Sequence, residues 1–70
     1  MQPFTEILTE KMKSTGHSAE TLSALTGIHM STLYDWKRGK STPNLLHAIE
    51  LADVFNCSLD ELVGRRVRTL

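Results

Sequence analysis

The hydrophobic and polar positions of this chain follow the spacing of amphipathic helices. In the first segment Phe4, Ile7, Leu8 and Met12 fall at i, i+3, i+4 and i+8, which predicts one apolar stripe on a helix of residues 3–14. No stretch alternates with a period of two residues, and no Asn-Gly or Asp-Gly pair marks a hairpin. The pattern therefore predicts an all-α chain.

Residues that tolerate a left-handed backbone follow each helical segment. These predicted helix stops are Gly16, Gly27, Gly39, Asn56 and Gly64. Glycine, and less often asparagine, is the usual residue just past the C-terminal end of a helix. Five stops predict five helices, and Ser18, Asn44 and the run SLDE at residues 58–61 predict the N-terminal caps of the second, fourth and fifth.

The predicted core takes residues from every helix. Leu22 and Leu25 are expected to face inward from the second helix, and Leu33 and Trp36 from the third. Residues 45–55 form the most apolar segment, which is expected to be the central helix. The last helix is expected to pack inward through Leu59, Leu62 and Val63.

Residues 22–40 organise the rest of the chain. Gly27 separates two short helices, and only two residues follow it before the next helix begins. A connection this short makes the helices cross steeply, as in a helix-turn-helix. The third helix ends in three cations, which are Lys37, Arg38 and Lys40. Such a helix suits the major groove of duplex DNA, which admits an α-helix between phosphates that attract cations.

Length and charge restrict the classes of function. Seventy residues make one domain with a small core and little room for a catalytic cleft. The net charge is zero, but cations gather at residues 37–40 and 65–68, whereas Glu50, Asp53 and residues 60–61 form an acidic group. A molecule with one basic end can still be steered toward phosphate.

Several site types are excluded or left without support. Cys57 is the only cysteine, so the chain can form no internal disulfide and no cysteine zinc site, and Cys57 is interpreted as a small buried hydrophobe. His17, His29 and His47 lie too far apart for a ligand set and are expected to be exposed. Without a nucleophile elbow or triad spacing, we expect no catalysis, cofactor, metal or small-molecule substrate. The absence of a signal peptide or a run of about 20 apolar residues predicts a cytoplasmic protein that contacts no membrane.

With these features in order, the chain resembles the Cro/C1-type helix-turn-helix family, the five-helix DNA-binding domain of lambdoid phage repressors and many bacterial regulators. The residues that carry the resemblance are Ser18, Gly27, Leu33, Trp36 and the runs RGKSTPN and LLHAIELADVFNCSLDELVG. The resemblance covers residues 4–64. It implies a compact five-helix bundle in a domain of residues 1–64, followed by a basic tail of residues 65–70.

The resemblance also implies a DNA site on the third helix. The base-reading positions of the family fall on Met30, Ser31 and Asp35, and its phosphate-binding positions fall on Lys13, His29, Thr32, Arg38 and Lys40. The chemistry agrees in part: Ser31 can bond several base edges, Asp35 could accept from a cytosine amino group, and Met30 could lie against a thymine methyl. Tyr34 and Lys37 are two further expected phosphate contacts.

Some positions depart from the family pattern or admit another role. Ala19 stands where the family usually has Gln, and His29 stands where it usually has Ser or Thr, and both changes weaken the phosphate clamp. Asp35 is equally well explained as a solvated acid paired with Arg38 or Lys37. The cations could form only a solubilising face.

The sequence therefore predicts a sequence-specific regulator, a phage or bacterial repressor, that binds double-stranded DNA. It is expected to act as a homodimer that reads a palindrome with half-sites about 34 Å apart. The expected dimer surface consists of Val63, Val67 and Leu70. The alternative is an antitoxin-like or partner-binding module with weak or no DNA affinity, which Ala19, Asp35 and the zero net charge would favour.

Overall fold

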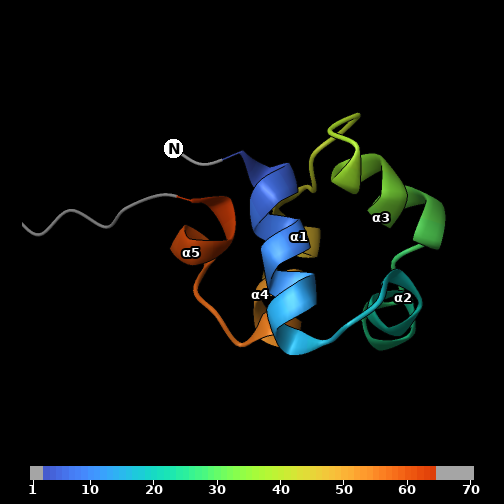
Figure 1. The fold of residues 1–70 in the computed structure, drawn as a ribbon, viewed down its shortest axis with the longest axis horizontal. Helices are drawn as coiled ribbons and strands as arrows, with labels where there is room; N and C mark the ends of the chain where they lie inside the picture. Colours follow the sequence, from blue (N-terminus) through green and yellow to red (C-terminus); the bar gives the residue numbers. More distant parts are fainter. Residues whose placement is uncertain (1–2, 65–70) are drawn as a thin grey trace, which may run out of the picture.

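Five helices make up the part of the chain that the computed structural model describes, residues 3–64 (Figure 1). They are α1 (Phe4–Thr15), α2 (Ala19–Thr26), α3 (Met30–Lys37), α4 (Leu45–Phe55) and α5 (Leu59–Val63). No strand occurs among these residues, and the predicted all-α, five-helix architecture is confirmed. The expected tail of residues 65–70, with Val67 and Leu70, lies outside the described residues.

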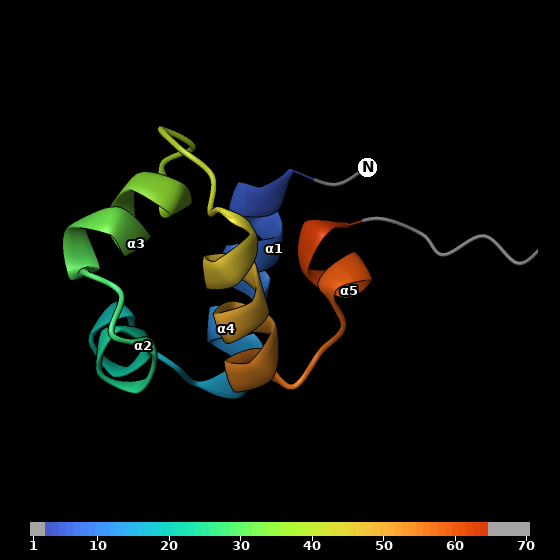
Figure 2. The ribbon, with the colours of Figure 1, turned by 180° about the vertical axis from the view of Figure 1, so that it is seen from behind.

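Two helices share the middle of the molecule. α1 and α4 lie side by side, with α2 and α3 on one side of them and α5 on the other (Figures 1 and 2). α1 contacts α3, α4 and α5, while α4 contacts α1, α2 and α5. α4 was predicted to be the central helix, and it holds that position together with α1.

One apolar cluster joins all five helices. Its large, fully buried side chains are Leu8, Leu22, Leu33, Trp36, Leu51 and Leu62. Burying one such side chain stabilises the fold by about 1.5–3 kcal/mol. Because α2, α3 and α5 each contain at most eight residues, this shared cluster, more than local helix propensity, holds them in place.

Local signals at the helix ends agree with the predictions. Ser18, Asn44 and Ser58 each accept a hydrogen bond from the backbone N–H three residues later, at 3.1, 2.9 and 3.1 Å. The predicted stops at Gly16, Gly27, Gly39, Asn56 and Gly64 all have positive φ. α1 begins one residue later than predicted, because Pro3 is its N-cap, and it ends one residue later, at Thr15, just before the left-handed Gly16.

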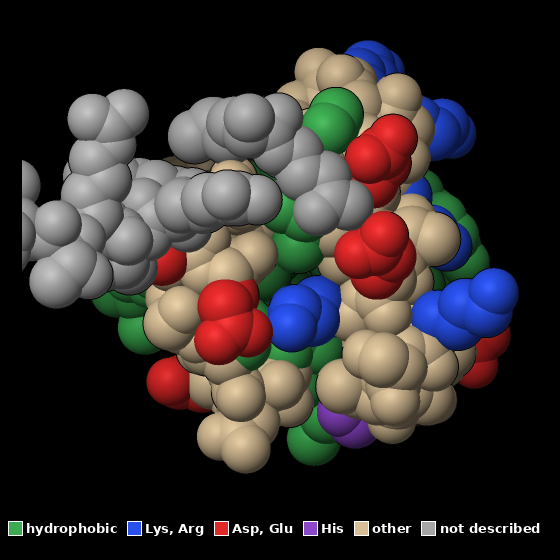
Figure 3. All heavy atoms as spheres, turned by 60° about the vertical axis from the view of Figure 1, so that its left-hand side comes forward, with side chains coloured by type: hydrophobic (Ala, Val, Ile, Leu, Met, Phe, Trp, Pro, Cys, Tyr) green, Lys and Arg blue, Asp and Glu red, His purple; other side chains and the backbone are tan. Residues whose placement is uncertain are grey.

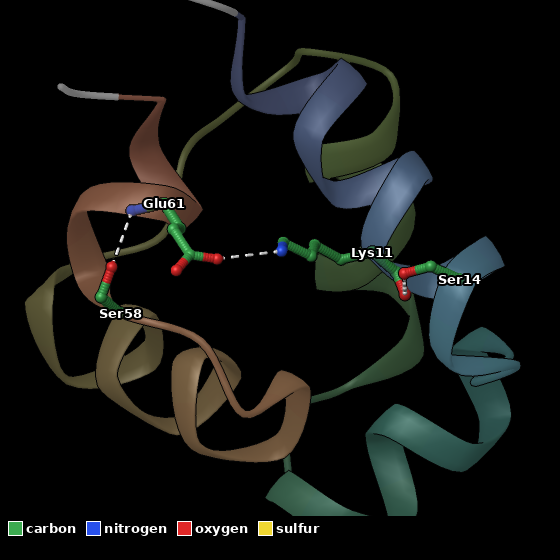
Figure 4. Close-up of polar contacts among 4 residues, drawn as sticks. All are labelled: Lys11, Ser14, Ser58 and Glu61. Atoms are coloured by element: carbon green, nitrogen blue, oxygen red, sulfur yellow. Dashed lines mark hydrogen bonds and ion pairs between the residues drawn. The ribbon is translucent and has the colours of Figure 1, made fainter.

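The run SLDE at residues 58–61 has the form of a capping box, of which only the serine half forms. Ser58 accepts the Glu61 N–H, but the Glu61 carboxylate turns toward α1, where its Oε2 lies 3.3 Å from Nζ of Lys11 (Figure 4). This ion pair joins residues 50 positions apart in the sequence. Lys11 of α1 is therefore paired with an acid from α5.

Two of the short helices bury fewer apolar residues than predicted. Leu25 is 58% exposed, because the inward row of α2 runs through Leu22 and Thr26, and Leu25 lies beside that row. Leu59 and Val63 are also exposed, at 38% and 37%. A helix of five residues makes little more than one turn, so α5 directs only one large side chain, Leu62, into the core.

The most apolar helix also keeps an exposed side. Leu45 and Leu46 are 68% and 71% exposed, and Ile49 is exposed as well. The buried row of α4 consists of Ala48, Leu51, Ala52 and Phe55. These positions follow the i, i+3, i+4 and i+7 spacing of a single helix face, which leaves the first turn of α4 with apolar side chains in water.

Two of the histidines are half-buried, although exposure was predicted for all three. The ring centroid of His17 lies 6.4 Å from that of Phe55, and the ring centroid of His47 lies 5.5 Å from that of Trp36. An imidazole has an apolar body and a polar tip, so it can cover an aromatic core residue at its edge. His29 is exposed, as predicted.

Cys57 lies half-buried against the core, between α4 and α5. Burial raises the pKa of its thiol, while the nearby Lys11 ammonium lowers that pKa and the Glu61 carboxylate raises it. Burial thus disfavours the thiolate, and the residue predicted to be a small buried hydrophobe is partly buried against the core.

Candidate nucleic-acid interface

α3 is held from behind by the two residues that were predicted to anchor it. Leu33 and Trp36 are buried. The Trp36 ring meets Phe4 of α1 edge-on, with centroids 6.5 Å apart and an interplanar angle of 80°, and it lies against His47 of α4. Contacts with two other helices fix how α3 is turned about its own axis, so its opposite side must face outward.

The outward side of α3 is polar. Ser31, Tyr34 and Lys37 are exposed, and Met30, Thr32 and Asp35 are half-buried. Two rows with i, i+4 and i+7 spacing run along this side, and they are Ser31–Asp35–Arg38 and Met30–Tyr34–Lys37. His29 is exposed at the start of the helix, and its side chain makes no cap hydrogen bond, as expected because histidine is a poor N-cap residue.

Backbone hydrogen bonds fix the basic end of α3. The Arg38 N–H donates to the Tyr34 carbonyl at 3.0 Å, and the Lys40 N–H donates to the Asp35 carbonyl at 2.9 Å. Gly39 provides the left-handed turn between them, with φ of 77°. Arg38 and Lys40 therefore project from a defined turn at the end of the helix.

Asp35 forms an ion pair within α3. Its Oδ1 lies 2.7 Å from Nη2 of Arg38, and the side chains are 32% and 67% exposed. Pairing with Arg38 was one of two roles considered for Asp35, and the structure contains it. A base contact by Asp35 stays a prediction.

An open groove joins α3 to α1 and to the start of α2. Its lining includes Lys13 of α1, Ser18 before α2, and Tyr34 and Lys37 of α3. The N-terminal end of a helix carries a partial positive charge, which adds to the two ammonium groups. The fold thus brings together three residues, Lys13, Tyr34 and Lys37, that were predicted to contact phosphate, along with the unpredicted Ser18.

The place of Ser18 in this groove could have been inferred from the sequence, because its role as the N-cap of α2 puts it at the positive end of that helix.

A second hollow, on the side of α1, is lined by Lys37 together with Glu6 and Glu10. The basic region therefore ends at Lys37 on this side.

Charge is divided unevenly over the described residues. Five Lys and Arg against eight Asp and Glu leave residues 3–64 with a net charge of −3. Lys13 and Lys37 line the groove, and Arg38 and Lys40 follow at the end of α3; we call these four cations the cationic surface. The face that carries α1 and α5 shows acidic side chains spread among basic ones (Figure 3). Among the described residues, the cationic surface is therefore the part that favours an anionic partner.

Two specific features are absent from the described residues. It contains no group of three or more His, Cys, Asp or Glu placed to hold a metal ion. None of its helices combines the length and the apolar character that crossing a bilayer requires.

Comparisons with known proteins agree with this geometry. The helix-turn-helix family model matches residues 8–62. Among solved structures, the chain is similar to the crystal structure of a transcriptional regulator from Listeria innocua, with a TM-score of 0.82 and 28% identity over 96% of this chain and 63% of that chain. This chain thus spans less than two thirds of the length of that regulator. The comparison with curated proteins found no match to this chain. Since the family model covers most of the sequence, the chain belongs to the Cro/C1-type helix-turn-helix family.

Proposed function

We propose that this protein is a sequence-specific DNA-binding regulator of transcription that acts as a repressor in the cytoplasm. The observation that carries the proposal is α3 itself, which is anchored through Leu33 and Trp36 and presents a polar outer side beside the cationic surface. The similar Listeria innocua protein is a transcriptional regulator, which supports the same function. A repressor would act by occupying its operator.

In this proposal α3 lies in the major groove of double-stranded DNA. Met30, Ser31 and Asp35 would contact base edges. The residues proposed to contact phosphates are Lys13, His29, Thr32, Tyr34, Lys37, Arg38 and Lys40. The groove between α1, α2 and α3 supports the assignment of Lys13, Tyr34 and Lys37, because all three residues line it.

We also propose that the protein binds as a homodimer. Two copies would read a palindrome with half-sites about 34 Å apart. Of the expected dimer surface, Val63 is exposed, and the exposed Leu45 and Leu46 of α4 offer a larger apolar area. Exposed apolar residues that lie close together on a small protein favour contact with another chain.

A second candidate function is an antitoxin-like or protein-interaction module. The net charge of zero and the exposed first turn of α4 favour it. Replacement of Arg38 and Lys40 by Ala distinguishes the two functions: DNA binding would collapse, whereas binding of a partner protein would survive.

The proposed function is tested by selecting bound duplexes from a random library and measuring affinity against salt concentration. Each neutralised phosphate contributes about −0.9 to the slope of log K against log salt. The double variant Lys13→Ala with Lys40→Ala should therefore flatten the slope by about 2 per protomer. Lys11→Ala is the matched control, because Lys11 is paired with Glu61 outside the cationic surface. A flat salt response of the unmodified protein would contradict the proposed function.

A further inference from the structure

We infer that Asp35 determines specificity by penalising duplexes that do not place a cytosine amino group beneath it. This inference rests on the proposed function, and it concerns how the same site distinguishes an operator from other DNA. Its starting point is the Asp35–Arg38 ion pair on the outward side of α3.

The position of Asp35 places a negative charge where DNA would approach. It lies in the middle of the row Ser31–Asp35–Arg38, one turn after a proposed base contact and one turn before a proposed phosphate contact. A carboxylate facing the phosphates of a duplex is repelled unless a cation or a hydrogen-bond donor compensates it. In the free protein Arg38 provides that compensation, at 2.7 Å.

Binding to DNA changes the partners of this pair. The guanidinium is 67% exposed, and exposed ion pairs of this spacing are weak, so DNA phosphates can compete with Asp35 for Arg38. If Arg38 turns to a phosphate, Asp35 loses its compensation. If Arg38 stays paired with Asp35, its positive charge is partly neutralised and attracts phosphate less strongly. Either outcome weakens binding to DNA of arbitrary sequence.

A matching base removes this penalty. A carboxylate can accept several hydrogen bonds, and the cytosine N4 amino group is the donor that Asp reads in the major groove. With cytosine beneath Asp35, the carboxylate keeps a donor while Arg38 binds phosphate. Asp35 thus lowers the affinity for most sequences and restores it at one base pair in each half-site.

The other ion pair supplies a matched control. Lys11–Glu61 is also exposed in part and also has a single carboxylate oxygen engaged, at 3.3 Å, but it joins α1 to α5 outside the α3 surface. Glu61→Gln changes the net charge by the same amount as Asp35→Asn. The comparison therefore separates a local effect of Asp35 from a general effect of protein charge.

The test measures affinity of the unmodified protein, Asp35→Ala, Asp35→Asn and Glu61→Gln for the selected operator and for a random duplex of equal length, at one salt concentration. Asp35→Ala should bind the random duplex about tenfold more tightly and should reduce the operator-to-random affinity ratio by at least about tenfold. Selection repeated with Asp35→Ala should lose a preference for cytosine at one position of each half-site. Glu61→Gln should leave the ratio unchanged.

An unchanged ratio in Asp35→Ala, or equal weakening on both duplexes with normal helicity by circular dichroism, would overturn the inference and leave the proposed function standing. Failure of the unmodified protein to bind any selected duplex would overturn the proposed function and this inference with it.

Discussion

α3 and α4 are neighbouring helices that are held in the molecule in different ways. α4 has eleven residues, a side-chain cap at Asn44, a left-handed stop at Asn56 and four buried residues. α3 has eight residues, begins at His29 without a side-chain cap, and buries only Leu33 and Trp36. Short helices are marginal on their own. The helix proposed to meet DNA is thus the one that depends more on contacts with the rest of the protein.

The largest effect is expected when the anchor of α3 is removed. Trp36→Ala should lower the free energy of unfolding by about 3–5 kcal/mol, because a large aromatic side chain in contact with α1 and α4 is lost. Urea denaturation followed by circular dichroism measures the change. Leu46→Ala in α4 is the control, since its side chain is 71% exposed, and it should change stability by less than about 0.5 kcal/mol. Similar losses in both variants would show that Trp36 does not anchor α3.

The turn after α3 can be tested through its glycine. Gly39 has φ of 77°, and a Cβ there would lie 3.3 Å from Cγ2 of Thr5, whereas a Cβ at Gly16, with φ of 73°, meets no described atom within 4 Å. Gly16→Ala should therefore destabilise by about 1–2 kcal/mol through backbone strain alone. Gly39→Ala should destabilise more, and adding Thr5→Ser should recover the excess, as measured by thermal unfolding. No recovery would show that the contact with Thr5 is unimportant.

The helix caps offer a smaller test with opposite signs. Asn44→Ala should destabilise by about 1 kcal/mol, because the bond from the His47 N–H at 2.9 Å is lost. His29→Ser should stabilise by about 0.5–1 kcal/mol, because α3 gains the side-chain cap it lacks. Urea denaturation of each variant measures these two changes in the free energy of unfolding. Stabilisation by His29→Ser would confirm that the local signals of α3 are suboptimal, and destabilisation would contradict it.

The smallest expected effect concerns the connection that follows α4. Burial raises the pKa of the Cys57 thiol, so the folded state favours the protonated form. The resulting stability is present below the ordinary thiol pKa and is lost as the pH rises through the raised pKa. Lys11→Met should raise this pKa further, because the ammonium lowers it. The rate of alkylation of Cys57 by iodoacetamide, measured against pH, reports this pKa. An unchanged pH profile in Lys11→Met would exclude an effect of Lys11 on the Cys57 thiol.

The helices could be predicted from the sequence because their signals are local. Caps such as Ser18 and stops such as Asn56 act within a few residues, and the inward positions of Leu33 and Trp36 follow from helical spacing. Apolar type alone could not show that Leu25 would be exposed. Which side of a two-turn helix is covered depends on the neighbouring helices, and their placement is not a local property.

The candidate site shows the same division between local features, which the sequence predicts, and contacts between helices, which it does not. The residues of α3 were found because they are adjacent in the sequence. The groove that joins Lys13 to Tyr34 exists only because α1 packs against α3. The pairing of Lys11 with Glu61 likewise requires α5 to pack on α1. The ionic residues are evident in the sequence, but which of them neutralise one another depends on contacts between helices far apart in the chain.

Trp36 is the only tryptophan in the chain, and it lies inside the protein two residues before Arg38. Its fluorescence is therefore an intrinsic reporter of the docking of α3, without any dye or engineered label. Emission should shift to longer wavelength when the indole meets water, and should stay in place when a duplex covers only the outer side of the helix. A single fluorescence measurement therefore distinguishes detachment of α3 from binding of a ligand to its outer side.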